Sequence, residues 1–572
     1  MAKDFRLDIT KFTGLDLSFE DSGSLGDGKS PDMVNLQITP DYHLKRRSGF
    51  FSVNTRYSDF RGIYYTTMGG VDKYLAVVGK KFYHAETSFV DLTAIKGEVP
   101  GTDKVTFFPF HGKVYLLTGC GIMVYDGETL AELEPHIPTL MISTAPDGSG
   151  VLYEDANLLT RKAKQFFCGD GESYKFIPVV THFSAIDHVI VDGRELAEEE
   201  YYWDDIRFEL KLTEIPTRGI DNVEIQFEIE GEDMSHLILN CRHATAFGGA
   251  SDTRSFLYGN IENPAVRYHS GIIDGKPCFG YFPETAVSLV GNGEEITSIL
   301  CHYDRQLIFT TCGAYYSYLE YMTGVDGVLN ATFPIFPLHD QWGNRAMGQA
   351  VLVENTPFTL TEHGLIQWTT TNIQDERNAQ SVSQPIDRAL REEKAASGML
   401  FNCKEQGELY LCFGKKCYVY NYRLKLFYFY DFHAFPPLNF IETPTGLFFC
   451  SGKSVFKMKG DSDEGKKITT RWRSRLFDFA NPSLQKKLFG VTLYMKAENG
   501  VDFAFGVRED QKELSGMQNF SVPAGIDRTK KRIAIYKRRF GLLEIRFETE
   551  GMKPFSIGEI SLKGRITDRE DL

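Results

Sequence analysis

One stretch of the 572-residue chain has the residue types and spacing of a catalytic motif. Gly23 to Ser30 reads GSLGDGKS, which satisfies the phosphate-loop pattern G-x-x-x-x-G-K-[ST]. In such loops glycines let backbone N–H groups surround the phosphates, the Lys reaches the terminal phosphate, and a helix begins at once with its positive end toward the anion. A nucleotide site is therefore the first chemistry to consider.

The residues around this motif disfavour a nucleotide. Pro31 follows Ser30 directly and pushes it out of the α conformation, and only the short run MVNLQI precedes the next break in the chain. Asp27 lies within the loop, with Glu20 close by in sequence, and would repel a triphosphate. We interpret the stretch as a Gly/Ser/Asp-rich turn within an extended N-terminal arm.

Other catalytic constellations are not visible in the sequence. The 13 His form neither His-x3-His nor His-Glu-x2-His, and the ten Cys include no C-x2-C pair, so no metal and no cofactor are predicted. His339 and Asp340 beside Trp342 form the most enzyme-like cluster, but a loop between repeats explains them more simply. Carboxylate pairs for glycoside cleavage meet only in three dimensions and stay open. On these grounds the chain is predicted not to be an enzyme.

Composition and charge indicate an all-β protein with an acidic body. Aromatic residues make up 13% of the chain, with 44 Phe and 28 Tyr, which favours strands. No run approaches the eighteen or so apolar residues of a membrane span. Residues 465–572 contain 22 Lys/Arg and 14 Asp/Glu, which leaves 41 basic and 63 acidic residues, a charge of −22, on the first 464. Such a body would not bind nucleic acid broadly, because it repels phosphates.

A repeated unit predicts a β-propeller. An apolar strand, a turn containing Gly and a second apolar or aromatic strand recur seven times, as in KYLAVVGKKFYHA from Lys73 and ELYLCFGKKCYVYN from Glu408. Most copies follow a further strand, so each unit resembles a three- or four-stranded meander, and six or seven blades are predicted. The turn glycines are Gly79, Gly119, Gly259, Gly313, Gly364, Gly414 and Gly452.

The spacing of the repeats divides the chain into domains. Residues 1–55 form the arm, and residues 56–148 and 233–464 form the propeller. The interval of 140 residues between Gly119 and Gly259 predicts an inserted β-sandwich over residues 149–232, with Asp-Gly turns at Asp170 and Asp192. Residues 465–572 alternate in period two and predict a C-terminal β-sandwich. One surface helix, QPIDRALREEKAASG, is expected to link blades.

Two surfaces are candidates for partner contacts. Tyr201, Tyr202 and Trp203 beside three Glu could form a binding rim on the inserted sandwich, although a loop entering a strand explains them more simply. The second surface is a basic face on the C-terminal sandwich, which would meet DNA or an acidic neighbouring subunit, or is an ordinary charged strand face. Its residues are Lys530, Lys531, Arg532, Lys537, Arg538 and Arg539.

Three segments resemble bacteriophage tail proteins of the nozzle or stabilisation type. One is GNIENPAVRYHSG from Gly259, another is WRSRLFDFANPSLQKKLFGV from Trp472, and the longest is the arm itself. Its matching residues are Gly14, Leu15, Leu25, Gly26, Asp27, Gly28, Ser30, Pro31, Asp32, Asn35, Arg46, Arg47, Gly49 and Phe50.

This resemblance implies a propeller subunit of a virion tail, assembled in the host cytoplasm. It implies a ring, often of six copies, below the portal and adaptor proteins of a short-tailed phage, where it extends the DNA conduit, retains the genome and docks tail fibres or a tip. DNA would pass the acidic body without sequence-specific binding. The arm would lie across its own or a neighbouring subunit through Asp27, Pro31, Met33, Val34, Asn35, Leu36, Ile38, Arg46 and Arg47.

Two other functions remain open on the sequence. A glycan-binding or glycan-degrading tail propeller would use the aromatic residues around Tyr202 as a sugar platform. A cellular interaction propeller would share the fold and lack the virion partners. These alternatives differ from the nozzle in the partner that they require.

Overall fold

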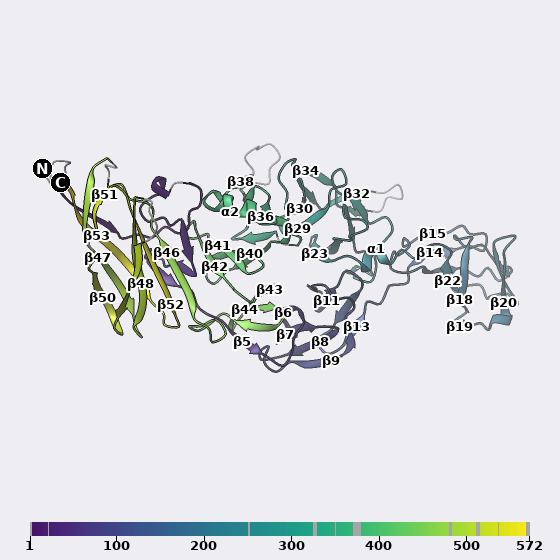
Figure 1. Ribbon diagram of the computed structural model, residues 1–572. Helices are drawn as coiled ribbons and strands as arrows, with labels where there is room; N and C mark the ends of the chain where they lie inside the picture. The colour runs from purple at the N-terminus through teal and green to yellow at the C-terminus, as the bar shows by residue number, and fades with distance from the viewer. Residues whose placement is uncertain are drawn as a thin grey trace.

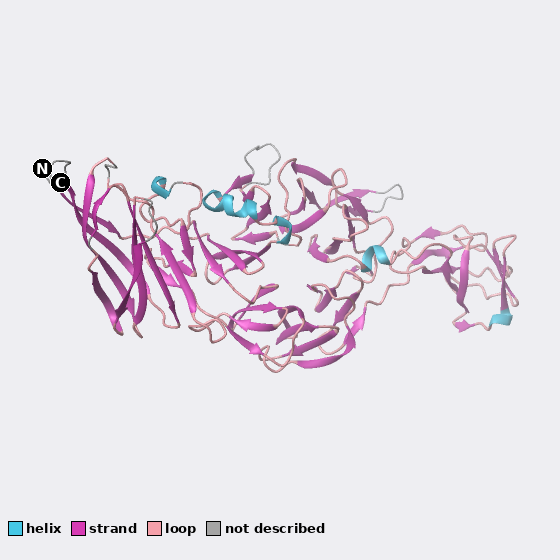
Figure 2. Ribbon diagram, in the orientation of Figure 1, coloured by secondary structure: helices cyan, strands magenta, loops and turns pink. Residues whose placement is uncertain are grey.

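The computed structural model describes residues 3–20, 22–249, 252–323, 329–348, 350–369, 379–479, 483–510, 515–535 and 537–567. The molecule is elongated and almost entirely β (Figure 1 and Figure 2). A large sandwich holding both termini lies at one end, a group of small sheets lies in the middle, and a smaller sandwich projects at the other end. The predicted all-β class is therefore confirmed.

Seven four-stranded antiparallel sheets form the middle region. Their strands, in order within each sheet, are β6 (Phe60–Met68), β7 (Val71–Val78), β8 (Lys81–Ala85) and β9 (Thr93–Glu98); β10 (Thr106–Phe110), β11 (Lys113–Leu117), β12 (Ile122–Tyr125) and β13 (Leu130–Glu132); β23 (His243–Phe247), β24 (Arg254–Tyr258), β25 (Val266–His269) and β28 (Val287–Leu289); β29 (Ile296–His302), β30 (Arg305–Thr310), β31 (Ala314–Tyr318) and β34 (Ile335–His339); β35 (Val351–Val353), β36 (Thr356–Thr361), β37 (Gly364–Trp368) and β38 (Ala379–Ser381); β39 (Met399–Cys403), β40 (Glu408–Phe413), β41 (Lys416–Asn421) and β42 (Leu426–Asp431); and β43 (Asn439–Thr443), β44 (Gly446–Ser451), β45 (Ser454–Lys457) and β5 (Phe51–Asn54).

The sequence repeat corresponds to these sheets one for one. Six of the seven turn glycines lie between the second and third strands of a sheet, and the seventh, Gly364, is the first residue of a third strand, β37. Gly79, for example, joins β7 to β8 with φ +53°. The second strands are the most buried, and in β40 every residue is buried. First strands of neighbouring sheets pack against one another, as β6 does with β10 and β43. This is a propeller-like arrangement in which each small sheet covers its neighbours.

The last of the seven sheets is completed from the other end of the chain. Its fourth strand is β5, where Val455 pairs with Asn54 and Phe456 pairs with Ser52. The sequence predicts residues 51–54 as part of the arm, because no turn next to FSVN connects it to a neighbouring strand. Residues 51–54 therefore belong to the propeller-like region.

The inserted sandwich begins at Thr139, earlier than the predicted boundary at residue 149. It has its own core around Phe167, Phe176 and Phe227. One sheet orders its strands as β15 (Val151–Leu152), β14 (Thr139–Thr144), β16 (Lys162–Phe167), β22 (Val223–Ile229), β18 (Phe183–Val191) and β19 (Arg194–Glu195), and the other as β17 (Lys175–Phe176), β21 (Glu209–Leu212) and β20 (Tyr201–Asp204).

The large sandwich is built from both ends of the chain, whereas the sequence had assigned it to residues 465–572 alone. One sheet contains β3 (Leu36–Ile38), β4 (Leu44–Arg46), β53 (Ser556–Thr567), β47 (Gln485–Ala497) and β50 (Gly525–Ile533), with β1 (Lys3–Ile9) on β53 and β51 (Lys537–Phe540) on β47. The other contains β2 (Asp32–Val34), β46 (Ile468–Arg473), β52 (Leu543–Gly551), β48 (Val501–Glu509) and β49 (Ser515–Val522). A single hydrophobic core runs from this sandwich into the last three small sheets.

Helices are short. They are α1 (His236–Leu239) and α2 (Asp387–Glu392), and α2 occupies only the middle of the predicted surface helix, with a 3-10 turn on either side of it. No helix within the described ranges has the length and apolarity needed to cross a bilayer.

Candidate functional site

The phosphate-loop motif forms a turn of the arm that is filled by the protein's own backbone. The Gly28 carbonyl accepts a hydrogen bond from Thr13, and the N–H groups of Lys29 and Ser30 donate to carbonyls of Gly26 and Gly14. A side chain at Gly28 would place its Cβ 2.0 Å from the Lys11 carbonyl oxygen. Since these N–H groups already have partners and no helix follows, the loop cannot cradle a phosphate.

Charged residues of the same turn are paired within the chain. Lys29 Nζ lies 3.0 Å from an Asp16 carboxylate oxygen, so it does not reach toward an open site. The predicted arm residue Asp27 accepts a hydrogen bond of 2.7 Å from Arg475 Nε, which joins the arm to the large sandwich. Ser30 Oγ donates to the Arg473 carbonyl across the same junction.

Arg47 is the centre of the junction between the arm, the small sheets and the sandwich. Its side chain is 1% exposed, and its guanidinium forms two hydrogen bonds with the Asp463 carboxylate, at 2.9 and 2.5 Å. The remaining donors reach Asn35 Oδ1 at 2.8 Å and the backbone carbonyls of Ser48 and Asp431. A buried ion pair is stable only when such extra hydrogen bonds compensate its desolvation, and here every donor has a partner.

Asn35 connects Arg47 to the strands on either side. It is fully buried with φ +55°, a conformation in which Asn is enriched. Its Oδ1 accepts from Arg47 and from the Asp431 N–H, and its Nδ2 donates to the Thr469 carbonyl at 2.9 Å. One amide side chain thus holds the arm to β42 and to β46 together.

The other predicted arm residues also serve this junction. Arg46 is 3% exposed, donates to the carbonyls of Gly551 and Met552, and pairs with Asp461 at 3.1 Å; burial lowers the pKa of its guanidinium. The apolar members Met33, Leu36 and Ile38 lie in the shared core, while Val34 and Pro31 are half-buried.

The structure therefore brings the predicted arm residues together against their own chain. Asn35, Arg46 and Arg47 are too buried to offer a surface to another subunit. Contact of the arm with a second copy stays a prediction. Sequence reasoning missed Asp463, the partner of Arg47, because 416 residues separate the two and only the folded chain brings them together.

The predicted basic face is divided between two strands of the large sandwich. Lys530 and Arg532 on β50 are exposed, and Lys530 lies 5.8 Å from the centre of the Tyr494 ring. Lys531, the residue between them, is half-buried and pairs in register with the core residue Leu493. Alternate residues of a strand point to opposite faces, so the three do not form one patch.

The remaining basic residues lie on β51. Lys537 Nζ is 3.5 Å from Glu509, Arg539 is exposed, and the side chain of Arg538 lies outside the described residues. Contact of this face with DNA or a subunit stays a prediction.

His339 and its neighbours form a loop contact. The Nδ1 atom of His339 accepts hydrogen bonds from the N–H groups of Gln341 and Trp342, and its ring stacks on Trp342 with centroids 5.4 Å apart. Burial lowers the pKa of His339 and favours the neutral ring that such acceptance requires. This turn follows β34, at the end of the fourth small sheet.

The aromatic rim of the inserted sandwich is mostly core. Tyr201 and Trp203 pack into its interior, where Trp203 lies 4.3 Å from the Phe183 ring, and only Tyr202, at 56% exposure, is open to solvent. Lys211 lies over the Tyr202 ring at 5.2 Å. A platform of three aromatic side chains is therefore not formed.

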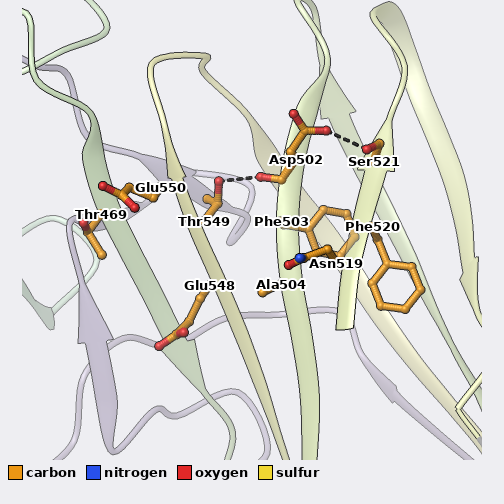
Figure 3. A pocket seen from close by; sticks show the side chains of 10 residues that line it. All are labelled: Thr469, Asp502, Phe503, Ala504, Asn519, Phe520, Ser521, Glu548, Thr549 and Glu550. Carbon is orange, nitrogen blue, oxygen red and sulfur yellow. Dashed lines mark hydrogen bonds between the residues drawn. The ribbon is translucent and has the colours of Figure 1, made fainter. Parts of the chain in front are cut away.

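A hollow of about 540 Å³ on the outer face of the large sandwich contains several acidic side chains (Figure 3). Asp502 accepts a hydrogen bond from Ser521, while Glu548 and Glu550 point away from it across the sheet. Glu548 is paired with Arg546. In the described parts of the chain, no three His, Cys, Asp or Glu side chains gather around a common point suited to a metal ion.

Comparisons with known proteins give no family. No protein-family model matches the chain, and no curated protein sequence is significantly similar. Similar solved structures include an exo-β-1,3-galactanase from Phanerochaete chrysosporium (8% identity, 91% of this chain and 100% of that one, TM-score 0.22). Others are a glycoside hydrolase (10% identity, 90% and 99%, TM-score 0.22) and YCF48 bound to a D1 peptide (7% identity, 74% and 96%, TM-score 0.25).

Two of these three structures are named as glycan-hydrolysing enzymes. The prediction that the chain is not an enzyme is contradicted by these neighbours and is withdrawn. The TM-scores assign no particular activity to the chain in its place.

Proposed function

We propose that the protein is a ring-forming subunit of a virion tail, of the nozzle or stabilisation type. The observation that carries the proposal is the junction at Arg47. Arm residues that resemble those of tail nozzle proteins, Asn35, Arg46 and Arg47 among them, are the residues that lock the small sheets to the large sandwich. The residues that resemble those of tail nozzle proteins are therefore also residues that join the small sheets to the large sandwich.

A rigid connection suits a subunit that must hold its shape in a pressurised conduit. The arm contributes strands to both sheets of the sandwich, and β5, which follows it directly, completes the last small sheet. The apolar residues Met33, Leu36 and Ile38 add buried area, which stabilises by about 25 cal/mol per Å². Relative motion between the two regions would require these contacts to break.

We infer further that the seven small sheets close into a seven-bladed propeller. Contacts link β6 to both β10 and β43, and β23 to both β10 and β29. The fourth and fifth sheets meet where His302 Nε2 lies 2.7 Å from the Asn355 carbonyl oxygen, and the fifth and sixth meet where Asn402 donates to the Leu352 carbonyl. Strand β5 would then close the ring by joining the two ends of the chain.

In the proposed ring of six copies, the number that the resemblance implies, DNA would slide past acidic bodies. The charge of −22 on the first 464 residues repels phosphates and would keep the conduit from binding DNA. The portal or adaptor and the tail fibres or tip would be the neighbours above and below.

Electron microscopy tests this role. The purified full-length chain, alone and in particles from cells that express its neighbouring genes, should form closed rings, and tail density should contain the two sandwiches and the seven sheets. A chain that stays monomeric at tens of micromolar and is absent from purified particles would refute the proposal.

A glycan-binding or glycan-degrading tail propeller is the second candidate. It is favoured by a hollow of about 400 Å³ where the first strands of the small sheets begin, since Tyr64 and Phe107 stack there with ring centroids 5.4 Å apart. Aromatic faces commonly pack against sugar rings. Release of reducing ends from host surface polysaccharide would support a degrading activity. Retention of the polysaccharide by the protein without such release would support binding.

A further inference from the structure

The hollow among the small sheets is lined by three basic side chains. Residues from five of the seven sheets line it, at the points where their first strands begin. Lys104 precedes β10, Arg242 precedes β23 and His243 starts β23, while Asn439 comes from β43. Basic side chains from separate sheets therefore converge within a body whose overall charge is strongly negative.

Some hydrogen-bond donors of these side chains have no partner in the described chain. In the described chain, Lys104 has neither a hydrogen bond nor an ion pair, and neither ring nitrogen of His243 is hydrogen-bonded. Arg242 pairs with Asp103 at 3.1 Å through one terminal nitrogen, and its Nε is buried without a partner. Asp103 is the one carboxylate among the residues that line the hollow. An unpaired buried donor costs free energy unless a ligand supplies the acceptor.

The surroundings of the hollow lower the pKa values of two of these basic groups. Desolvation lowers the pKa of Lys104, although its side chain is open to water along the hollow. Desolvation, together with the charges of Lys104 and Arg242, lowers the pKa of His243 to about 3. A perturbed pKa inside a cleft is typical of binding sites, and the neutral His243 ring can still donate one hydrogen bond.

The backbone fixes two of the three groups. A Cβ at Gly348 would lie 2.5 Å from Cε1 of His243, and a Cβ at Gly119 would lie 2.9 Å from Nε of Arg242. Both glycines have positive φ; Gly119 lies in the turn between β11 and β12, and Gly348 lies between β34 and β35. The two side chains thus pack directly against backbone at these glycines. This packing limits their movement and preorganises them for a ligand.

We infer that this hollow binds a small ligand bearing a carboxylate or phosphate group, with Lys104, Arg242 and His243 facing the anion. Its volume of about 400 Å³ suits a molecule of sugar or metabolite size. The remaining walls are apolar and aromatic, from Ile63, Tyr64 and Phe107 among others, so an anionic sugar fits better than a bare ion. The inference is independent of ring assembly, and it rests on the glycan role only in the choice of sugar probes.

Ligand-observed NMR titration of the full-length protein tests the site. The probes are glucuronate, glucose 6-phosphate, inorganic phosphate and, as the neutral control, glucose. We expect saturable binding of at least one anionic probe, with glucose at least tenfold weaker. Tighter binding of glucuronate identifies the ligand group as a carboxylate, and tighter binding of glucose 6-phosphate or phosphate identifies it as a phosphate.

Variants assign the binding to the hollow. Lys104→Gln should weaken the anionic probe about tenfold or more, whereas Lys96→Gln, an exposed Lys on the outer strand β9 of the adjacent sheet, should leave it unchanged. Equal binding of glucose, no binding of any anionic probe, or unchanged affinity in Lys104→Gln would overturn the inference. Failure of the protein to form rings would leave these results interpretable, since binding is measured on the chain itself.

Discussion

Two basic sites in this molecule, one buried at Arg47 and one at the hollow around Lys104, differ in what surrounds them. Arg47 has every donor satisfied and pairs with a carboxylate that is itself buried. Lys104, at the hollow, has no partner in the described chain, and its neighbour Arg242 leaves a buried donor unpaired. A paired buried charge holds a fold together, whereas basic side chains that line a hollow without full pairing contribute little to the fold. The second kind indicates a function outside the fold itself.

The largest effect is expected at the paired site. Arg47→Met would leave Asp463 buried without a cation, which typically costs about 3–5 kcal/mol. Urea unfolding followed by tryptophan fluorescence reports on this region, because Trp472 pairs with Met33 of the arm.

Lys45→Met is the matched control for that variant. Lys45 is exposed on the same strand, β4, so its loss should change the free energy of unfolding by less than about 0.5 kcal/mol. Equal effects of the two variants would show that the ion pair does not hold the junction.

Glu408 contrasts with the Arg47–Asp463 pair, because it is a buried carboxyl group that forms no ion pair in the described chain. Tyr428 donates to one of its oxygens, the other has no partner, and burial raises its pKa to about 7. The folded state then holds a proton that the unfolded chain loses near pH 4.5, so stability should fall as pH rises from about 4.5 to 7. Glu408→Gln should remove this slope and stabilise the protein by up to about 3 kcal/mol at pH 8.

Unfolding midpoints measured from pH 4.5 to 8 check this prediction. Glu405→Gln, at an exposed position on the turn that leads into β40, should keep the wild-type slope. An unchanged slope in Glu408→Gln would mean that the carboxyl group is ionised in the folded protein.

The hollow should affect stability much less than the Arg47 site. Because Lys104 is exposed, Lys104→Gln should change the free energy of unfolding by less than about 0.5 kcal/mol. Thermal unfolding with and without an anionic probe measures both properties. A loss of more than about 1 kcal/mol in the free protein would place Lys104 with Arg47 as a structural residue.

The smallest effect on stability is expected at the exposed basic face. Lys530→Glu with Arg532→Glu should change the unfolding free energy by less than about 0.5 kcal/mol. If this face meets DNA in a tail, ring assembly should persist while genome release changes, and Lys563→Glu on the exposed part of β53 should have no effect. Unchanged release would remove the DNA contact.

The sequence predicted local features well and distant pairings poorly. The seven turn glycines located every small sheet, and five of them have the positive φ that Gly adopts readily, all except Gly313 and Gly452. The places of residues 51–54 and Asp463 were missed. Each pairs with a segment at the other end of the propeller-like region in sequence, and no local pattern reveals such a partner. Lys104 and His243 carried no motif at all. Their meeting depends on how five sheets are placed around one hollow.

The strand order has a consequence for how the chain folds during synthesis. Strand β1 pairs with β53, and β5 pairs with β45, so the segments that leave the ribosome first find partners only when the chain is nearly complete. Until then their edges remain open, which slows folding and exposes the nascent chain to aggregation. Premature termination anywhere before residue 556 would leave β1 without its partner strand, so truncated copies are expected to be cleared rather than incorporated.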